Sequence, residues 1–499
     1  MNWQPYNYQQ QRLSFYNMFK STVLAAFILF SISSCNKLVD PGAPEASINE
    51  ENVYKDDGSA IAAVTGIYAS MATPAFENTV GDFTGAKSIS FLCGIASDEL
   101  TLYSGVSDPM FKAYYTNNLI ANSTQSYGSE HWLTIYNLIF RCNAAIAGLS
   151  ASGSLTPAVR QQLLGEVHFL RGFFYFYLTN MFGEVPLVTG TDPNVNRTLA
   201  RSSQTTVYQL IKEDLTTAGE ELSERYLNAD LKSESSERIR PTKWAAAGLL
   251  SRVYLFMNDY ENAEKQASLV IDNPSLYELT AADDVFLQNS MEAIWQLQPV
   301  KMGHNTEDAW NFVLPDTGPS DFSFGFGYPT YVSEELLAAF EAGDTRRKHW
   351  IDSVIVTGQT YYYPFKYKKA VYGDAVTEYL MVLRLAEIYL IRAEARAQQN
   401  NISAAQQDLD KVRTRAGLSA TSASDKTSLV DAITRERQVE LFTEWGHRWF
   451  DLKRLGKIDG VMNTVATAKG GSWSSFKALF PIPFVDIQRS GVIKQNTGY

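Results

Sequence analysis

"FLRGFFYFYLTNMFGEVPLV", residues 169–188, decides the fold. Leucines and other apolar residues recur at spacings of three and four, and aromatic side chains also fill the remaining faces. A helix that is apolar all round is normally buried between neighbours. We therefore expect a central helix over residues 161–182, which Gly183 and Pro186 end.

Further helical patterns flank this segment on both sides. One apolar stripe covers residues 132–149, and another helix is expected over residues 206–222. Residues 241–272 and 379–415 each predict two helices joined by a short turn, with small residues where the helices cross. This is the physics of tetratricopeptide hairpins, although more than a hundred residues separate the two copies.

The last predicted helix runs from residue 429 to residue 455. Its apolar residues line one face, and charged residues form a ladder along another. We interpret the ladder as a structural ion network on a packed helix.

A different composition marks residues 276–378, which are rich in Gly, Pro, Asp and Phe. Residues 353–356 and 359–363 flank Thr357-Gly358 and predict a β-hairpin. The chain is thus expected to be mainly α, with helix hairpins that support an irregular, loop-rich lobe and a few short β-hairpins.

The N-terminal region has the pattern of an export signal. The apolar run over residues 23–32 is too short to span a bilayer, follows Lys20 and precedes Ser33-Ser34-Cys35. Ile32-Ser33-Ser34-Cys35 resembles a bacterial lipobox, so we expect Cys35 to be lipidated and to begin the mature chain. The alternative is a soluble signal peptide in which the cysteine occurs by chance. Several acyl chains suffice for stable anchoring. Met18 offers a start of ordinary proportions for such a signal.

These patterns divide the chain into five parts. The predicted parts are a signal peptide (1–34), a lipidated tether (35–50), an N-terminal helical region (51–275), a loop-rich ligand-binding insertion (276–378) and a C-terminal region (379–499).

Composition and motifs exclude several classes of function. The net charge is −11 and no Lys/Arg block stands out. Because a nucleic-acid-binding protein needs a basic face, we do not expect nucleic acid as a partner. The five histidines show no metal spacing, and nucleophile-elbow and phosphate-loop motifs are missing. We expect no cofactor, and the sequence does not indicate whether a structural Ca²⁺ binds. Cys93 and Cys142 are expected to be buried thiols rather than a disulfide.

Six segments, in order, resemble the SusD/RagB family of Bacteroidetes outer-membrane lipoproteins. They are "YNLIFRCNAAI" (136–146), "FLRGFFYFYLTNMFGEVPLV" (169–188), "RIRPTKWAAAGLLSRVYL" (238–255), "LRLAEIYLIRAEA" (383–395), "ITRERQVELFTEWGHRWFDLKRLG" (433–456) and "LFPIPFVDIQRSGVIKQNTGY" (479–499). The resemblance covers almost the whole mature chain, and Thr497 stands where proline is commoner in the family.

The resemblance implies a fold of four tetratricopeptide-like helix pairs under a loop-rich lobe. It also implies a non-catalytic lipoprotein, exposed at the surface of the outer membrane, that binds an oligosaccharide or polysaccharide. Such proteins cap a SusC-like TonB-dependent transporter and pass the nutrient to it.

Two loop zones carry the residue types that a glycan site needs. Flat aromatic rings suit the C–H face of a sugar, and carboxylate or amide groups suit its hydroxyls. The candidate ligand-binding residues are Asp98, Glu99, Tyr103, Asn305, Asp308, Trp310, Phe324, Phe326 and Tyr328. Loop packing is the alternative role for each of them.

Two other functions stay open at this point. A surface glycoside-active enzyme would need two carboxylates facing each other across a cleft, for which Asp98-Glu99 and Glu334-Glu335 are the conceivable pairs. A tetratricopeptide adaptor would need its repeats to expose a concave groove for a protein.

Overall fold

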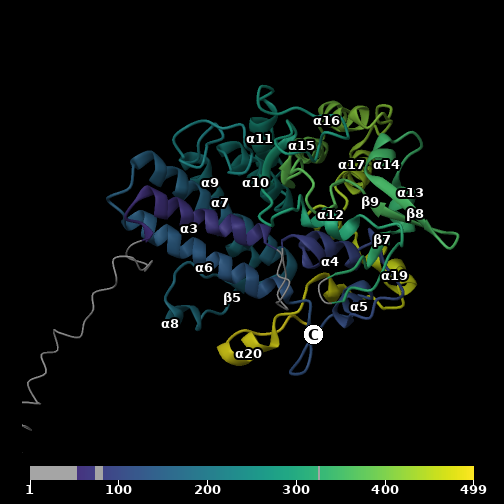
Figure 1. Cartoon of the computed structure of the whole chain (residues 1–499), viewed down its shortest axis with the longest axis horizontal. Coiled ribbons are helices and arrows are strands. Elements are labelled where there is room, and N and C mark those ends of the chain that lie inside the picture. The colour runs from purple at the N-terminus through teal and green to yellow at the C-terminus, as the bar shows by residue number, and fades with distance from the viewer. Residues whose placement is uncertain (1–52, 74–82, 324–325) are drawn as a thin grey trace, which may run out of the picture. The chain divides into compact units, whose positions relative to one another are not determined.

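The computed structural model describes residues 53–73, 83–323 and 326–499 (Figure 1). The residues from Val53 to Tyr499 form one compact unit. The residues of the predicted signal peptide and tether, with Met18 and Cys35, lie outside the described residues, and so does Phe324.

The unit is mainly α-helical, as predicted. Its α-helices are α3 Asp57–Ala72, α4 Ile89–Ala96, α5 Pro109–Tyr115, α6 Glu130–Ala151, α7 Pro157–Phe182, α8 Pro193–Asn196, α9 Gln204–Glu221, α10 Lys243–Phe256, α11 Tyr260–Ile271, α12 Glu307–Phe312, α13 Glu334–Ala339, α14 Thr345–His349, α15 Leu385–Gln398, α16 Ile402–Arg415, α17 Lys426–Glu440, α18 His447–Arg454, α19 Ile458–Ala468 and α20 Phe484–Ser490. Two 3₁₀ turns are η1 Gly85–Lys87 and η2 Ser475–Ala478. Within the described part of the chain, every helix is too short or too polar to cross a bilayer.

Short strands pair two by two, always antiparallel. The pairs are β1 Leu100–Leu102 with β7 Thr330–Val332, β2 Ile120–Ala121 with β3 Ser126–Tyr127, β4 Val185–Pro186 with β5 Arg201–Ser202, β6 Ala293–Leu297 with β10 Leu380–Arg384, and β8 Ile351–Val356 with β9 Gln359–Pro364. The β8–β9 pair confirms the hairpin predicted around Thr357-Gly358.

Helix α7 is the centre of the helical layer, and every residue from Phe169 to Phe182 is buried. Helices α3, α6 and α9 pack around it and lie beside it in Figure 1. Glycines permit the closest approach, because a Cβ at Gly165 would lie 2.8 Å from Leu222 Cγ and one at Gly172 would lie 3.1 Å from Leu215. The prediction that this aromatic helix, apolar on all faces, is buried between its neighbours is therefore confirmed.

The two helix pairs separated in sequence pack against each other. Helices α10 and α11 form one pair, α15 and α16 form the other, and α11 contacts α15 directly. The residues just before α15 were expected to belong to the same helix, but they form strand β10 instead. All five β10 residues are buried next to β6. The first four are apolar, and the fifth, Arg384, is paired with carboxylates inside the protein.

The predicted single helix over residues 429–455 is wrong: α17 ends at Glu440 and α18 begins at His447. The intervening backbone is left-handed at Thr443 (φ 54°), Trp445 (φ 49°) and Gly446 (φ 70°). Carbonyl groups that would accept helical hydrogen bonds in a continuous helix instead accept hydrogen bonds from buried cations. Lys366 Nζ donates to the carbonyl oxygens of Glu440 and Phe442, both at 2.8 Å.

The charged ladder is indeed an ion network, but it lies inside the protein. Arg384, 1% exposed, bonds Glu292 (2.8 Å), Glu440 (2.5 Å) and Glu444 (2.7 Å). Arg346 also bonds Glu440, at 2.7 Å. Several cations per carboxylate hold the pKa of Glu440 well below its usual range despite its burial.

Removal of the Arg384 guanidinium should take one of the paired cations from each of three buried carboxylates. We expect Arg384→Met to lower the free energy of unfolding by about 3–5 kcal/mol, as seen when one partner of a buried ion pair is removed. Urea unfolding followed by circular dichroism measures the change. The matched control is Arg225→Met at an exposed arginine, for which we expect a change within about 0.5 kcal/mol. Equal stabilities of the two variants would contradict the role given to Arg384.

Glu99 is a second buried acid, and it lacks a full set of partners. Its side chain is 1% exposed and its Oε1 has no hydrogen-bond partner among the described residues. Burial, with the Asp98 charge beside it, raises the pKa of Glu99 to about 8. The folded protein therefore keeps a proton on Glu99 at a pH where the unfolded chain has released it.

This retained proton makes stability pH-dependent. Glu99 contributes stability below about pH 4.5, and that contribution is lost as the pH rises toward 8. Because a glutamine side chain at this position would stay neutral, we expect the free energy of unfolding of Glu99→Gln to match that of the wild type at pH 4. At pH 8 it should exceed the wild-type value by on the order of a few kcal/mol. Urea midpoints at both pH values test this, with exposed Glu334→Gln as control. A variant that is weaker than the wild type at pH 8 would refute the charge state assigned to Glu99.

Candidate ligand-binding site

The pairing of β1 with β7 brings parts of the two predicted loop zones together. Tyr103 N donates to Pro329 O at 2.8 Å, one residue from Tyr328. Asp321 accepts both the Ser107 N–H (2.8 Å) and the Ser107 hydroxyl (2.6 Å). Phe326 extends from this region with 70% of its side chain exposed.

Asp98 and Glu99, by contrast, point into the protein. Asp98 is 4% exposed and accepts two bonds from the Arg448 guanidinium, at 2.8 and 2.6 Å. This bidentate pair ties the short segment between α4 and β1 to α18. The buried Asp98-Glu99 pair therefore does not face a cleft that could admit a sugar.

Asn305 and Asp308 are internal too. Asp308 is 3% exposed, accepts the Gly85 N–H at 3.2 Å, and burial raises its pKa to about 7. Asn305 is 2% exposed and makes its hydrogen bonds to the backbone of residues 375–378. The predicted polar residues thus shape the loops from within.

Trp310, in α12, belongs to an aromatic cluster on the surface. Its ring stacks on His304 with centroids 4.1 Å apart and planes 16° apart. Tyr372 stands across the edge of His304, with centroids 6.1 Å apart and planes at 82°. We call His304, Trp310 and Tyr372 the aromatic corner. Tyr372 is 67% exposed, so this cluster offers a ring to a ligand.

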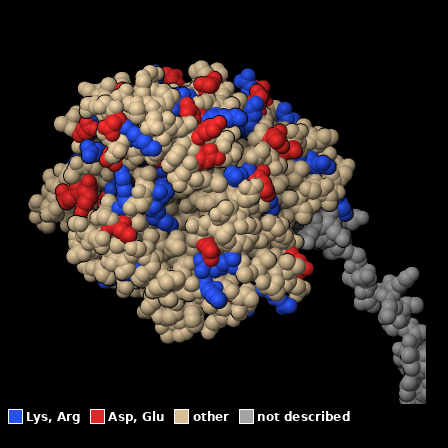
Figure 2. All heavy atoms as spheres, turned by 180° about the vertical axis from the view of Figure 1, so that it is seen from behind, with Lys and Arg blue, Asp and Glu red and all other residues tan. Residues whose placement is uncertain are grey.

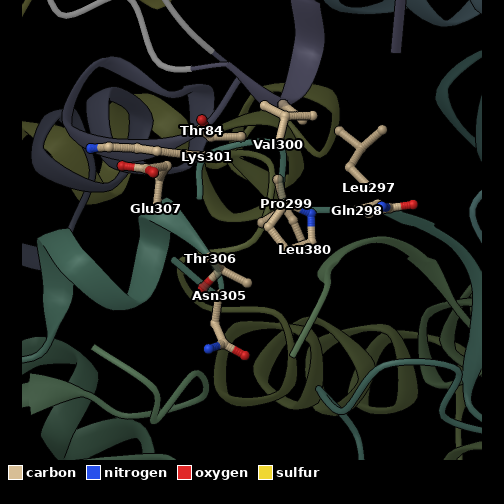
Figure 3. A pocket seen from close by; sticks show the side chains of 11 residues that line it. Thr84, Leu297, Gln298, Pro299, Val300, Lys301, Asn305, Thr306, Glu307 and Leu380 are labelled. Atoms are coloured by element: carbon tan, nitrogen blue, oxygen red, sulfur yellow. The ribbon is translucent and has the colours of Figure 1, made fainter. Parts of the chain in front are cut away.

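A pocket is lined by the chain segments that come directly before and after His304 (Figure 3). It contains about 280 Å³ of empty space, part of it open to solvent. Residues 297–301, Asn305, Thr306 and Glu307 line it, with Thr84, Ala72 and Leu380. In Figure 3 the Lys301 and Glu307 side chains lie alongside each other at one end. The lining is mixed, with six polar or charged residues and five apolar ones.

His304 is uncharged at neutral pH. Burial, together with the nearby Lys301 charge, lowers its pKa to about 4. Its Nδ1 lies 2.9 Å from Glu307 Oε1, and burial raises the pKa of Glu307. A neutral imidazole stacks on Trp310 without carrying a charge into the site, which suits an uncharged ligand such as a sugar.

Sequence reasoning found Trp310 but missed His304 and Tyr372. Tyr372 lies in the segment "KKAVYGDAV", where an aromatic residue before Gly in a polar loop was the available signal. Its proximity to Trp310 depends on contacts between residues about seventy positions apart, such as Thr377 N to Asn305 Oδ1 at 2.7 Å.

The face shown in Figure 2 gives no sign of a nucleic-acid interface. On the side shown in Figure 2, Lys and Arg are interspersed with Asp and Glu over a mostly uncharged surface. Among the residues that the structure describes, no group of His, Cys, Asp and Glu is arranged to hold a metal ion. Cys93 and Cys142 are both buried and unpaired with each other, as expected.

Two family models match the chain. The model of the SusD family matches residues 328–499, and a model described as "starch-binding associating with outer membrane" matches residues 96–255. A SusD-like protein of Bacteroides ovatus is 26% identical, over 87% of this chain and 82% of that protein.

Solved structures have the same fold. A SusD superfamily protein of Bacteroides vulgatus superposes with a TM-score of 0.74 at 20% identity, covering 89% of this chain and 99% of that one. A laminarin-binding SusD-like protein gives 0.71 at 25% identity, covering 89% and 100%. With family models that match residues 96–255 and 328–499, the chain belongs to the SusD/RagB family.

Proposed function

We propose that this protein is a non-catalytic, glycan-binding lipoprotein of the outer-membrane surface. It captures an oligosaccharide at the aromatic corner and passes it to a SusC-like TonB-dependent transporter. The observation that carries the proposal is the exposed Tyr372 ring beside the stacked His304–Trp310 pair and the adjoining pocket. Family membership supports it, since one related structure is described as laminarin-binding and one matching model as starch-binding.

The two alternative functions fit the geometry less well. An enzyme acting through Asp98-Glu99 would need substrate to reach side chains that are 4% and 1% exposed. Glu334 and Glu335 are exposed, but they are adjacent residues in the first turn of α13 and do not face each other across a cleft. A tetratricopeptide adaptor would need open grooves, whereas α10 and α15 are buried along most of their length. We also propose that capture needs no metal or organic cofactor.

Binding should depend on the aromatic corner. Aromatic anchors carry much of the binding energy in such sites, so we expect Trp310→Ala and Tyr372→Ala each to weaken binding at least about tenfold. Affinity gel electrophoresis against laminarin, starch, xylan and pectin, followed by calorimetry on the polysaccharide that retards the wild type, measures this.

Trp244→Ala is the matched control. Trp244 lies on α10, is partly exposed and donates its indole N–H to Glu224 O at 3.1 Å. Tyr103→Ala tests the second aromatic zone, near Tyr328 and Phe326, in the same assay. Retention of full affinity by both corner variants would reject the site, and a wild type that binds none of the four polysaccharides would reject the proposed function.

Anchoring should depend on Cys35. We expect Cys35→Ala to abolish labelling with a clickable fatty acid and to move the protein from the outer-membrane fraction to the soluble fraction, because the lipid supplies the membrane affinity. Ser34→Ala, which keeps a small residue before the cysteine, serves as control. Unchanged labelling and fractionation of Cys35→Ala would contradict the lipoprotein proposal.

A further inference from the structure

The exposed Tyr372 sits at the tip of a loop, residues 369–378, that has no helix or strand of its own. Such a loop is ordinarily mobile, and an aromatic ring on it would lose conformational freedom when a ligand binds. The contacts that hold the loop therefore decide how much affinity Tyr372 can contribute.

Asn305 contacts the loop at three backbone positions. Its Nδ2 donates to Ala375 O at 3.1 Å, and its Oδ1 accepts the N–H groups of Thr377 at 2.7 Å and Glu378 at 3.0 Å. At 2% exposure the amide is shielded from water, which strengthens these bonds and makes their loss costly. Asn305 is thus a clamp between two segments of the candidate site.

The tip and the base of the loop are also held. At the tip, Gly373 N donates to Gly303 O at 2.9 Å, and the Tyr372 ring lies against Gly303. A Cβ on Gly303 would come within 2.6 Å of Tyr372 Cε2. At the base, the Glu378 carboxylate accepts the N–H groups of Lys368 (2.8 Å) and Lys369 (3.0 Å).

We propose that Asn305 is a positioning residue for ligand binding and does not itself touch the sugar. It fixes residues 375–378, and through them it keeps Tyr372 perpendicular to His304 before a ligand arrives. This inference rests on the proposed function. It also changes the role predicted for Asn305 from the sequence, where it was expected to contact the ligand.

Asn305→Ala should therefore weaken binding through Tyr372 alone. We expect about a tenfold higher Kd for the polysaccharide that retards the wild type, and faster hydrogen exchange in peptides that cover residues 369–378. In a Tyr372→Ala background the same substitution should change the Kd less than about twofold. Asn305→Asp, which keeps the acceptor for Thr377 and Glu378, should lose less affinity than Asn305→Ala.

Asn496→Ala is the matched control. Asn496 is 6% exposed and likewise clamps the backbone, donating to Phe182 O at 3.0 Å and Phe480 O at 2.8 Å. If the substitutions act through a general loss of stability, the Kd should rise in both variants. If Asn305 positions Tyr372, the Kd should rise in Asn305→Ala alone.

A second pair of variants avoids a buried substitution. Gly303→Ala places a methyl group against Tyr372, whereas Gly343→Ala introduces the same change at an exposed glycine of similar φ (88° against 78°) with no neighbour within 4 Å. We expect Gly303→Ala to raise the Kd in the wild-type background but not in the Tyr372→Ala background. Gly343→Ala should leave the Kd unchanged in both.

The outcomes separate this inference from the proposed function. If Tyr372→Ala weakens binding but Asn305→Ala does not, or if their effects add in the double variant, the positioning role is overturned and the site stands. If neither Trp310→Ala nor Tyr372→Ala weakens binding, the proposed site falls and the inference falls with it.

Discussion

The contact between Arg384 and the carboxylates of Glu292, Glu440 and Glu444 joins three segments that are far apart in the sequence. Charges buried this deeply are tolerated only when each is fully paired, so the segments must come together as a set. The network also explains the gap between α17 and α18. Arg384 and Lys366 both bond the Glu440 carbonyl, which a continuous helix would have used internally.

The candidate site is built on the ribbon that this network anchors. Strands β6 and β10 pair with Ala293 opposite Arg384 at one end and Leu297 opposite Leu380 at the other. From the second end, the chain leaves β6 into the loop that carries His304 and Asn305, and it enters β10 from the loop that carries Tyr372. The two loops that form the aromatic corner therefore begin from one fixed point, and Asn305 adds the clamp between them.

Local sequence patterns predicted an element correctly wherever its own residues determined its structure. The all-round apolar α7 and the turn at Thr357-Gly358 were predictable because their own residues settle them. The end of α17 was not, because it depends on Lys366, which comes 74 residues earlier in the chain. Tyr372 was missed for the same reason, since its place beside His304 depends on contacts to residues 303–305.

Polar residues in the loops show a different kind of limit. Asp98, Asp308 and Asn305 are of the types that bind sugar hydroxyls, but the same types also bond Arg448 and the backbone N–H groups that irregular loops leave unpaired. A sequence does not distinguish the two uses. An irregular lobe needs many such internal bonds, so the loops richest in Asp and Asn need not be those that present polar groups to a ligand. Exposed aromatic rings have no comparable internal role, because exposing them to water is unfavourable, and Tyr372 is therefore the more specific sign of a binding surface.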